Sequence, residues 1–139
     1  MVDAERLGAR LDRLEQLIER LEEVRARGEA TYLRDAWLRA ATERWLQLAI
    51  QIAIDMGAQL VSERSVSPPS DYAGVFTALA DASVLERDLA ERLVAAARQR
   101  NLLVHAYLDV DDRRLFASLT RLDDLRDLAA AVQGLIDAG

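Results

Sequence analysis

Residues 48–55 read LAIQIAID, and this stretch decides the fold because it is apolar on more than one side of a helix. It lies at the centre of a helix that the apolar spacing predicts from about Tyr32 to Glu63. One apolar stripe of this predicted helix consists of Trp37, Ala41, Trp45, Leu48 and Ile52. A helix that is apolar on several sides is typically covered by other helices. We therefore expect residues 32–63 to form the central helix of the protein.

The sequence on both sides predicts further helices. Leucine and isoleucine recur with a 4-3-4-3 spacing before the central helix, which predicts a helix from about residue 3 to Gly28. After it, the segment SVSPPSD at residues 65–71 is a strong break, because proline cannot continue a helix and Ser70 or Asp71 can cap the next one. The helices expected after this break cover about residues 72–81, 84–107 and 113–136. Together these patterns predict an all-α fold, an up-down bundle of four long helices plus a short connector helix.

The composition limits the class of protein. The 139 residues are 51% apolar with two prolines, which predicts a single helical domain over residues 1–139. The absence of cysteine excludes disulfides and thiolate metal sites. The sequence has no charged-then-apolar leader and no run of about 18 apolar residues, so we expect a cytoplasmic protein that does not enter the membrane.

The charge balance bears on nucleic-acid binding. The formal net charge is −6, and every basic residue is arginine. This balance argues against broad, sequence-independent binding of nucleic acid, because neutralisation of phosphates supplies most of that affinity. Any contact with RNA is therefore expected to be local, or to be assembled from two subunits.

The densest group of reactive side chains lies in residues 100–107, which read RNLLVHAY and contain the only histidine. On an ideal helix that advances about 100° per residue, Arg100, Asn101, His105 and Tyr107 share one broad face, and Leu102, Leu103 and Ala106 can pack inward. Histidine can move a proton near neutral pH, and arginine can hold phosphate oxygens as negative charge develops. Because RNA carries its own nucleophile, the 2′-hydroxyl, these residue types fit RNA cleavage without a metal.

A structural interpretation of the same residues is also open. A lone histidine on a helix is more often a satisfied structural residue than a catalytic one. Asn101 can brace the helix or bond to His105 one turn away. The aromatic ring of Tyr107 can pack in the core or in an interface, while its hydroxyl group forms a hydrogen bond with water.

The single histidine favours assembly into a dimer. Acid–base cleavage of RNA ideally uses two proton-transfer groups. A two-fold dimer that brings two motif helices together would supply two histidines and two arginines. Val104 lies among the polar groups, and residues 89–107 carry apolar side chains in two directions, one for the protein's own bundle and one for a second subunit. We therefore expect a homodimer formed through this helix.

Three segments resemble the HepT branch of the HEPN superfamily, the ribonuclease toxins of bacterial and archaeal toxin–antitoxin pairs. They are ERWLQLAIQIAIDMGAQLV at 43–61, DYAGVFTAL at 71–79 and RNLLVHAYLDVDDRRLFASL at 100–119. The last contains the R-x4-H-x-Y signature followed by D-x-D, and the order and spacing agree with the family. One departure is that residues 96–99, AARQ, lack the glycine and aromatic residue that often precede the arginine.

The resemblance implies a metal-independent endoribonuclease toxin of a type II/VII-like pair, with no cofactor. Arg100 would bind the phosphate, His105 would transfer protons and Asn101 would orient the site, which would lie in a cleft of a homodimer. The implied partner is an MNT-type nucleotidyltransferase antitoxin, which can attach AMP to the motif tyrosine, here Tyr107. Asp55 is an auxiliary candidate, although an acid that faces solvent or an arginine is an equal interpretation.

Two alternatives complete the sequence-based expectations. Asp109, Asp111 and Asp112 could suggest a metal site, but acids before a helix favour roles as caps and partners of the helix dipole. The whole chain could also be a non-catalytic helical module that holds a nucleotide or a partner nucleotidyltransferase. The intact Arg100, Asn101 and His105 favour the enzyme.

Overall fold

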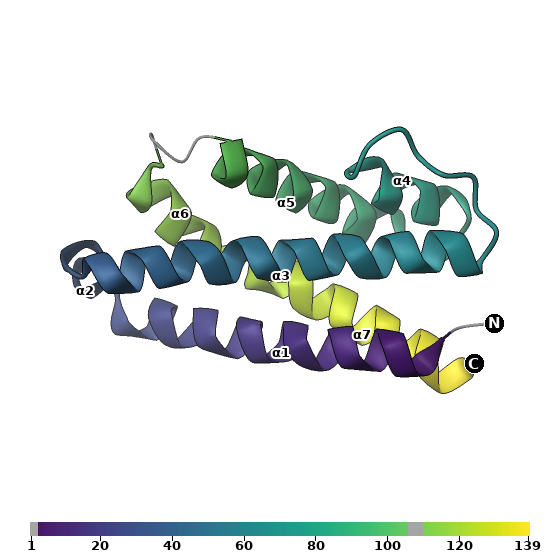
Figure 1. The fold of residues 1–139 in the computed structure, drawn as a ribbon, viewed down its shortest axis with the longest axis horizontal. Helices are drawn as coiled ribbons and strands as arrows, with labels where there is room; N and C mark the ends of the chain where they lie inside the picture. The colour runs from purple at the N-terminus through teal and green to yellow at the C-terminus, as the bar shows by residue number, and fades with distance from the viewer. Residues whose placement is uncertain (1–2, 106–109) are drawn as a thin grey trace.

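Four long helices carry the fold: α1 (Ala4–Arg27), α3 (Ala36–Glu63), α5 (Arg87–His105) and α7 (Leu122–Ala138). The shorter elements are α2 (Glu29–Arg34), α4 (Gly74–Asp81), α6 (Asp112–Ser118) and the 3-10 turn η1 (Leu119–Arg121). This computed structural model describes residues 3–105 and 110–139, and the side chains of residues 3–101 and 110–139. The long helices alternate in direction, so that both termini lie at the same end of the bundle (Figure 1). The predicted all-α, up-down bundle is confirmed.

The helix predicted from Tyr32 to Glu63 is divided at Asp35. The backbone of Asp35 is extended, with φ −113° and ψ 102°, and its side chain accepts a hydrogen bond from the Leu38 backbone N–H at 3.0 Å. An aspartate that caps the next helix in this way ends the preceding helical turn. The chain therefore makes a corner at α2 before α3 begins. Gly28, with φ +90°, makes the turn between α1 and α2.

The last predicted helix, residues 113–136, is also divided. The Ser118 hydroxyl donates to the Leu115 carbonyl at 2.5 Å, and the Thr120 hydroxyl donates to the Ala117 carbonyl at 2.8 Å. Hydroxyl groups that bond back to carbonyls of the preceding turn bend helices. The bend separates α6 from α7, while Leu119 within η1 stays buried.

The interior of the bundle confirms the central place of α3. This helix packs against α1, α4, α5 and α7, and the alanine and isoleucine residues at 49, 50, 53 and 54 are buried. At Gly57, an added Cβ atom would lie 2.5 Å from Cγ1 of Val75, so the absent side chain lets α4 approach α3 closely. The N-cap of α4 is Ala73 rather than the predicted Ser70 or Asp71, although the Asp71 side chain accepts a hydrogen bond from the Gly74 N–H at 2.7 Å.

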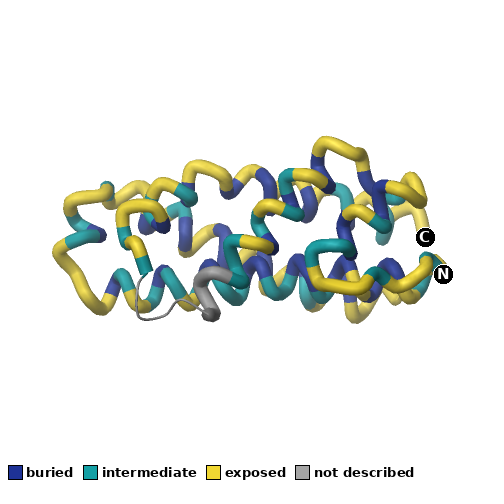
Figure 2. The backbone as a smooth tube through the Cα atoms, turned by 90° about the horizontal axis from the view of Figure 1, so that it is seen from above, coloured by how far each residue is buried: buried dark blue, intermediate teal, exposed yellow. Residues whose placement is uncertain are grey.

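The apolar stripe predicted on this helix is not its buried row. Trp37 is 89% exposed, and Ala41, Trp45, Leu48 and Ile52 are only partly buried. The buried row of α3 is a different one: Leu38, Thr42, Leu46, Ala49, Ile50, Ala53 and Ile54. In Figure 2 buried stretches alternate with intermediate and exposed ones along the helices. Here α3 carries two apolar rows, one buried and one partly exposed. Trp45, Leu48 and Ile52 of the second row pack in part against the core, and the Arg20 guanidinium of α1 lies 5.6 Å from the centre of the Trp45 ring.

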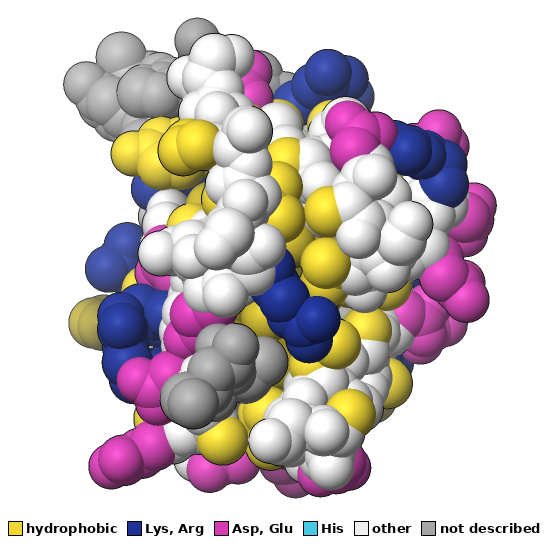
Figure 3. Space-filling model, turned by 90° about the vertical axis from the view of Figure 1, so that its right-hand side faces the viewer, with side chains coloured by type: hydrophobic (Ala, Val, Ile, Leu, Met, Phe, Trp, Pro, Cys, Tyr) yellow, Lys and Arg dark blue, Asp and Glu magenta, His cyan; other side chains and the backbone are white. Residues whose placement is uncertain are grey.

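Charge is mixed over the end of the bundle that holds the termini. Figure 3 looks onto this end and shows arginine and acidic side chains interspersed with apolar ones. Within the described part of the chain, no helix is long and apolar enough to cross a lipid bilayer.

Candidate functional site

Arg100 lies near the C-terminal end of α5, at the end of the bundle opposite the termini (Figure 1). It follows the buried residues Leu93 and Ala97 at intervals of four and then three positions, which keeps all three on one face of the helix. The row that leads to Arg100 therefore faces the protein's own core. The sequence predicted apolar side chains in two directions on this helix. The direction in which Leu93 and Ala97 point is the one that packs within the protein's own bundle.

The guanidinium group of Arg100 is incompletely satisfied. Its Nη1 donates to the Asn101 side-chain oxygen at 3.4 Å, which is a long contact. Its Nε is buried and has no hydrogen-bond partner among the described residues. A buried donor without a partner costs about 1–3 kcal/mol. An anionic oxygen brought by a ligand would remove this cost.

The two remaining residues of the motif lie at the edge of what the structure describes. His105 is the last residue of α5, but its side chain lies outside the described side chains. The same holds for the side chains of Leu102, Leu103 and Val104, while Ala106 and Tyr107 lie outside the described residues altogether. The structure thus brings together Arg100 and Asn101, and the roles of His105 and Tyr107 stay predictions.

The acidic residues that follow the motif start a helix. Asp111 is the N-cap of α6, and its side chain accepts hydrogen bonds from the N–H groups of Arg113 and Arg114 at 3.1 and 3.2 Å. Asp112 lies in the first turn and forms an ion pair with Arg39 at 3.4 Å. The predicted capping role is confirmed for Asp111, whereas Asp109 lies outside the described residues. No group of metal-binding side chains occurs in the part of the chain that the structure describes.

Asp55 lies on another side of α3. Its carboxylate accepts a hydrogen bond from the Gln51 amide at 2.8 Å. It lines a cavity of about 320 Å³ between α1 and α3, together with Arg6, Arg10 and Gln59. The hydrogen bond described for Asp55 thus stays within α3, and the cavity that it lines is shared with α1 rather than with α5.

A cluster of titratable side chains joins α2, α3 and α6 at the same end of the bundle as Arg100. Burial raises the pKa of the Glu43 carboxyl above its ordinary value, and the nearby charge of Asp112 raises it further. Burial also raises the pKa of the Tyr32 hydroxyl, which has no hydrogen-bond partner among the described residues. Arg39 donates to the Leu33 carbonyl and pairs with Asp112, so it ties the three elements together.

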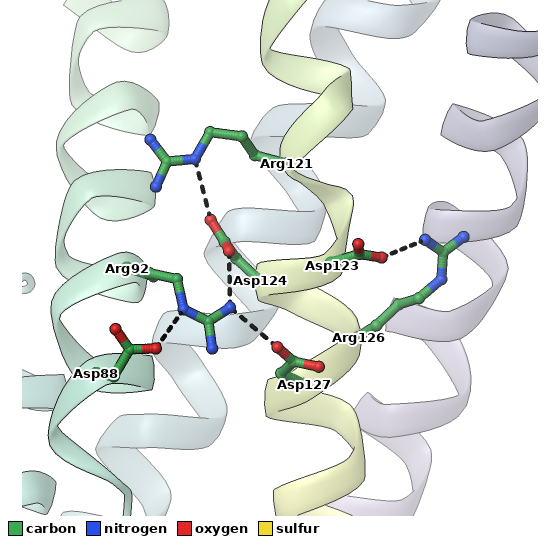
Figure 4. A network of polar contacts seen from close by, with 7 residues as sticks. All are labelled: Asp88, Arg92, Arg121, Asp123, Asp124, Arg126 and Asp127. Carbon is green, nitrogen blue, oxygen red and sulfur yellow. Dashed lines mark hydrogen bonds and ion pairs between the residues drawn. The ribbon is translucent and has the colours of Figure 1, made fainter.

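Ion pairs hold α5 against α7 two turns before Arg100 (Figure 4). Arg92 donates to Asp124 at 2.8 Å and to Asp127 at 2.9 Å, and its Nε donates to Asp88 at 3.1 Å. These hydrogen bonds, that to Asp124 first, raise the pKa of the guanidinium above its ordinary value. Arg121 also pairs with Asp124, at 3.3 Å. The network fixes the place of α5 in the bundle, and with it the position of the motif.

A groove of about 630 Å³ opens between α5, α6 and α7. Its floor includes Leu46 and Ile50 of α3, and arginines from three elements line it: Arg98, Arg114 and Arg121. Sequence reasoning missed this groove because no spacing rule relates residues on different helices. The one available signal was the position of Arg98, two residues before Arg100.

Sequence comparisons place this chain among known relatives. A family model described as ribonuclease HepT-like matches residues 14–133. A protein named tRNA nuclease HepT, from Aphanizomenon flos-aquae, is 32% identical over 79 residues. That alignment covers 57% of this chain and 54% of the relative, so the chain spans about half the length of the curated relative it matches.

The structural comparisons support the fold. A tri-AMPylated Shewanella oneidensis HEPN toxin, solved in complex with MNT antitoxin, superposes with a TM-score of 0.85 at 19% identity, over 96% of this chain and 99% of that one. YutE from Bacillus subtilis, a cytosolic protein of unknown function, superposes with a TM-score of 0.83 at 19% identity, over 99% and 92% of the two chains. At this identity the likeness concerns the fold alone.

Proposed function

This chain belongs to the ribonuclease HepT-like family, and we propose that it is a metal-independent endoribonuclease toxin with one HEPN domain over residues 1–139. The observation that carries the proposal is the buried, unpartnered Nε of Arg100 beside Asn101. A guanidinium held in this state is prepared to accept an anion, because the ligand supplies the missing acceptor. The curated relative named tRNA nuclease HepT supports RNA as the source of that anion.

In the proposed reaction Arg100 holds the scissile phosphate and stabilises the charge that develops on its oxygens. His105 transfers a proton to or from the ribose hydroxyl or the leaving oxygen. The 2′-hydroxyl of the RNA is the nucleophile. Asn101 orients Arg100, since its side-chain oxygen accepts the hydrogen bond from Nη1. Asp55 is the weakest of the candidates, because it bonds to Gln51 within α3 and lines a cavity shared with α1 rather than with the motif helix.

We propose that two copies of the chain form the active species, with the site in a cleft between them. The exposed apolar stripe of α3 supports this assembly, since Trp37, Leu48 and Ile52 remain at the surface in one copy. Residues 41, 45, 48 and 52 follow a 4-3-4 spacing, which suits helix-to-helix packing across a two-fold axis. Pairing also supplies a second histidine and a second arginine.

The proposed partner in the cell is an MNT-type nucleotidyltransferase antitoxin. A structural neighbour that is an AMPylated HEPN toxin in complex with MNT antitoxin supports this choice. We propose Tyr107 as the AMP acceptor. On the helix predicted from the sequence, position 107 would follow Arg100 by almost two turns, so an attached phosphate group is expected near the guanidinium. The nucleoside would then exclude RNA from the site.

The test is cleavage of total RNA, tRNA included, by the purified protein in the presence of EDTA. We expect cleavage to persist with EDTA and to be lost in His105→Ala and in Arg100→Ala, while circular dichroism shows an unchanged helical fold. Arg27→Ala is the matched control, because Arg27 is an exposed arginine on α1. Loss of cleavage on chelation would overturn the mechanism, and full activity of His105→Ala would do the same. A folded protein that cuts no RNA but binds a nucleotide or the nucleotidyltransferase would support the non-catalytic module.

A further inference from the structure

The groove between α5, α6 and α7 combines two kinds of surface. Its floor is apolar, with Leu46 and Ile50 of α3 and Leu122 and Leu125 of α7. Its rim is polar and carries Arg98 on α5, Arg114 on α6 and Arg121 on η1, with Gln99 and Ser118 between them. The volume of about 630 Å³ lies within the range of sites that bury small ligands. An apolar floor under a cationic rim suits a base attached to phosphates.

The acids of the groove are already occupied by the protein itself. Asp111 caps α6 through two backbone N–H groups, and Asp124 pairs with Arg92 and Arg121. Arg98 and Arg114 are exposed, and their guanidinium groups form no hydrogen bond or ion pair within the described part of the chain. Two unengaged cations thus remain at the rim of the groove. In a chain with a net charge of −6, this local excess of positive charge is the kind of surface that RNA requires.

The groove is continuous with the motif along α5. Arg98 and Gln99 line the groove and directly precede Arg100. Positions 98 and 105 are seven residues apart on α5, so they share one face of the helix and lie about 10 Å apart along its axis. Arg100 lies on a different face of α5, since it follows Arg98 by only two residues. A strand that leaves position 105 along the face shared with Arg98 would pass Arg98 as it enters the groove.

We propose that this groove binds the stretch of substrate RNA that flanks the scissile phosphate. Arg98 and Arg114 contact its phosphates, and the apolar floor receives one base. This inference rests on the proposed function, since it assigns a binding surface to the same substrate. It commits to RNA rather than to a protein partner because the free groups at the rim are guanidiniums, which match phosphate geometry.

The test uses the double variant Arg98→Gln/Arg114→Gln and fluorescently labelled bulk tRNA. Binding is measured by anisotropy in the His105→Ala background, where cleavage is stopped. We expect the affinity to fall about tenfold, and the slope of log affinity against log salt to become shallower by about 1.4 to 1.8, as the loss of two phosphate contacts requires. Arg27→Gln/Arg64→Gln is the matched control, since it removes the same charge from exposed arginines outside the groove.

A second variant fills the groove without changing its charge. Ala95 is exposed and lines the groove, so Ala95→Trp should weaken tRNA binding, whereas Ala9→Trp on α1 should not. The groove variants should also be assayed for tRNA cleavage in proteins that keep His105. We expect each of them to have a raised KM and a nearly unchanged kcat.

The outcomes separate the two proposals. A wild-type protein that cuts no RNA would overturn the proposed function. If Arg98→Gln/Arg114→Gln cleaves RNA normally, with an unchanged KM, affinity and salt slope, the groove assignment is overturned. The proposed ribonuclease function would not be affected by this result. Loss of binding to the nucleotidyltransferase with unchanged tRNA affinity would show that the groove receives a protein, which also overturns the assignment.

Discussion

Nη1 of Arg92 on α5 donates to Oδ1 of Asp124 on α7 at 2.8 Å, and Asp124 is only 8% exposed. This pair joins two helices that are distant in the sequence, and it lies two turns before Arg100. It is more buried than the ion pair between Asp123 and Arg126 on the same part of α7, whose side chains are 78% and 43% exposed. The two pairs should therefore differ in their contribution to stability.

We predict that Asp124→Ala lowers the free energy of unfolding by about 2 kcal/mol, because it leaves Arg92 and Arg121 without a nearly buried acceptor while both keep some contact with solvent. Asp123→Ala, one residue away, should change it by less than about 0.5 kcal/mol, since an exposed pair contributes little. Urea denaturation followed by circular dichroism measures both. Equal losses in the two variants would show that the network is not what holds α5 to α7.

Replacement of Arg100 should separate stability from activity. Arg100→Met removes a buried donor that has no partner, so we expect the free energy of unfolding to stay unchanged or to rise by about 1 kcal/mol. RNA cleavage should be lost in the same variant. A clear loss of stability would instead indicate that Arg100 is a structural residue, and thermal unfolding beside a cleavage assay decides between these outcomes.

Glu43 should make stability depend on pH. Its pKa in the folded protein is raised above the ordinary value of 4.5. The folded state therefore binds the proton on Glu43 more tightly than the unfolded state does. The resulting stabilisation of the fold is fully present below the pKa of the unfolded state, and it is lost as the pH rises through the pKa of the folded state. Glu43→Gln should remove this decline, while Glu15→Gln on exposed α1 surface should keep it. The measurement is the urea midpoint from pH 4 to pH 7, and parallel curves for wild type and Glu43→Gln would contradict the prediction.

The exposed stripe of α3 should control assembly. Leu48→Glu places a charge in the stripe, so we expect it to convert a dimer into a monomer at micromolar concentration and to lower RNA cleavage at the same time. Ala40→Glu, on an exposed position of the same helix outside the stripe, is the control. Sedimentation velocity reports the mass. A Leu48→Glu protein that remains dimeric would place the interface elsewhere, and a charged substitution at Val104 would then test the motif helix.

Tyr107 should control neutralisation by the partner. Coexpression with the nucleotidyltransferase should give an inactive protein whose intact mass has increased by one or more AMP groups. Tyr107→Phe should escape this modification and keep much of its cleavage, because the tyrosine hydroxyl takes no part in the proposed proton transfer. An inactive wild-type protein with no added mass would indicate that the partner acts by sequestration.

Some features of the site followed from the sequence alone. The motif was recognised by its order and spacing, and the comparisons confirmed the family. The spacing puts Arg100 in register with Leu93 and Ala97, but that this side of α5 meets the protein's own bundle could not be predicted, because it depends on how the helices pack. The partly buried carboxyl of Glu43 and the rim arginines of the groove were also missed, since neighbours from other elements create both environments.

The sequence by itself determined the helical class, the number of long helices and the break at residues 65–71. Helical periodicity and the effect of proline act over a few residues, so they can be read locally. Only the tertiary structure decided which of the two apolar rows of α3 is buried, where Asp35 and η1 divide the longer helical patterns, and that Arg92 meets Asp124. Each of these depends on what the neighbouring helices cover, and that is settled only when the whole bundle packs and removes the largest apolar area from water.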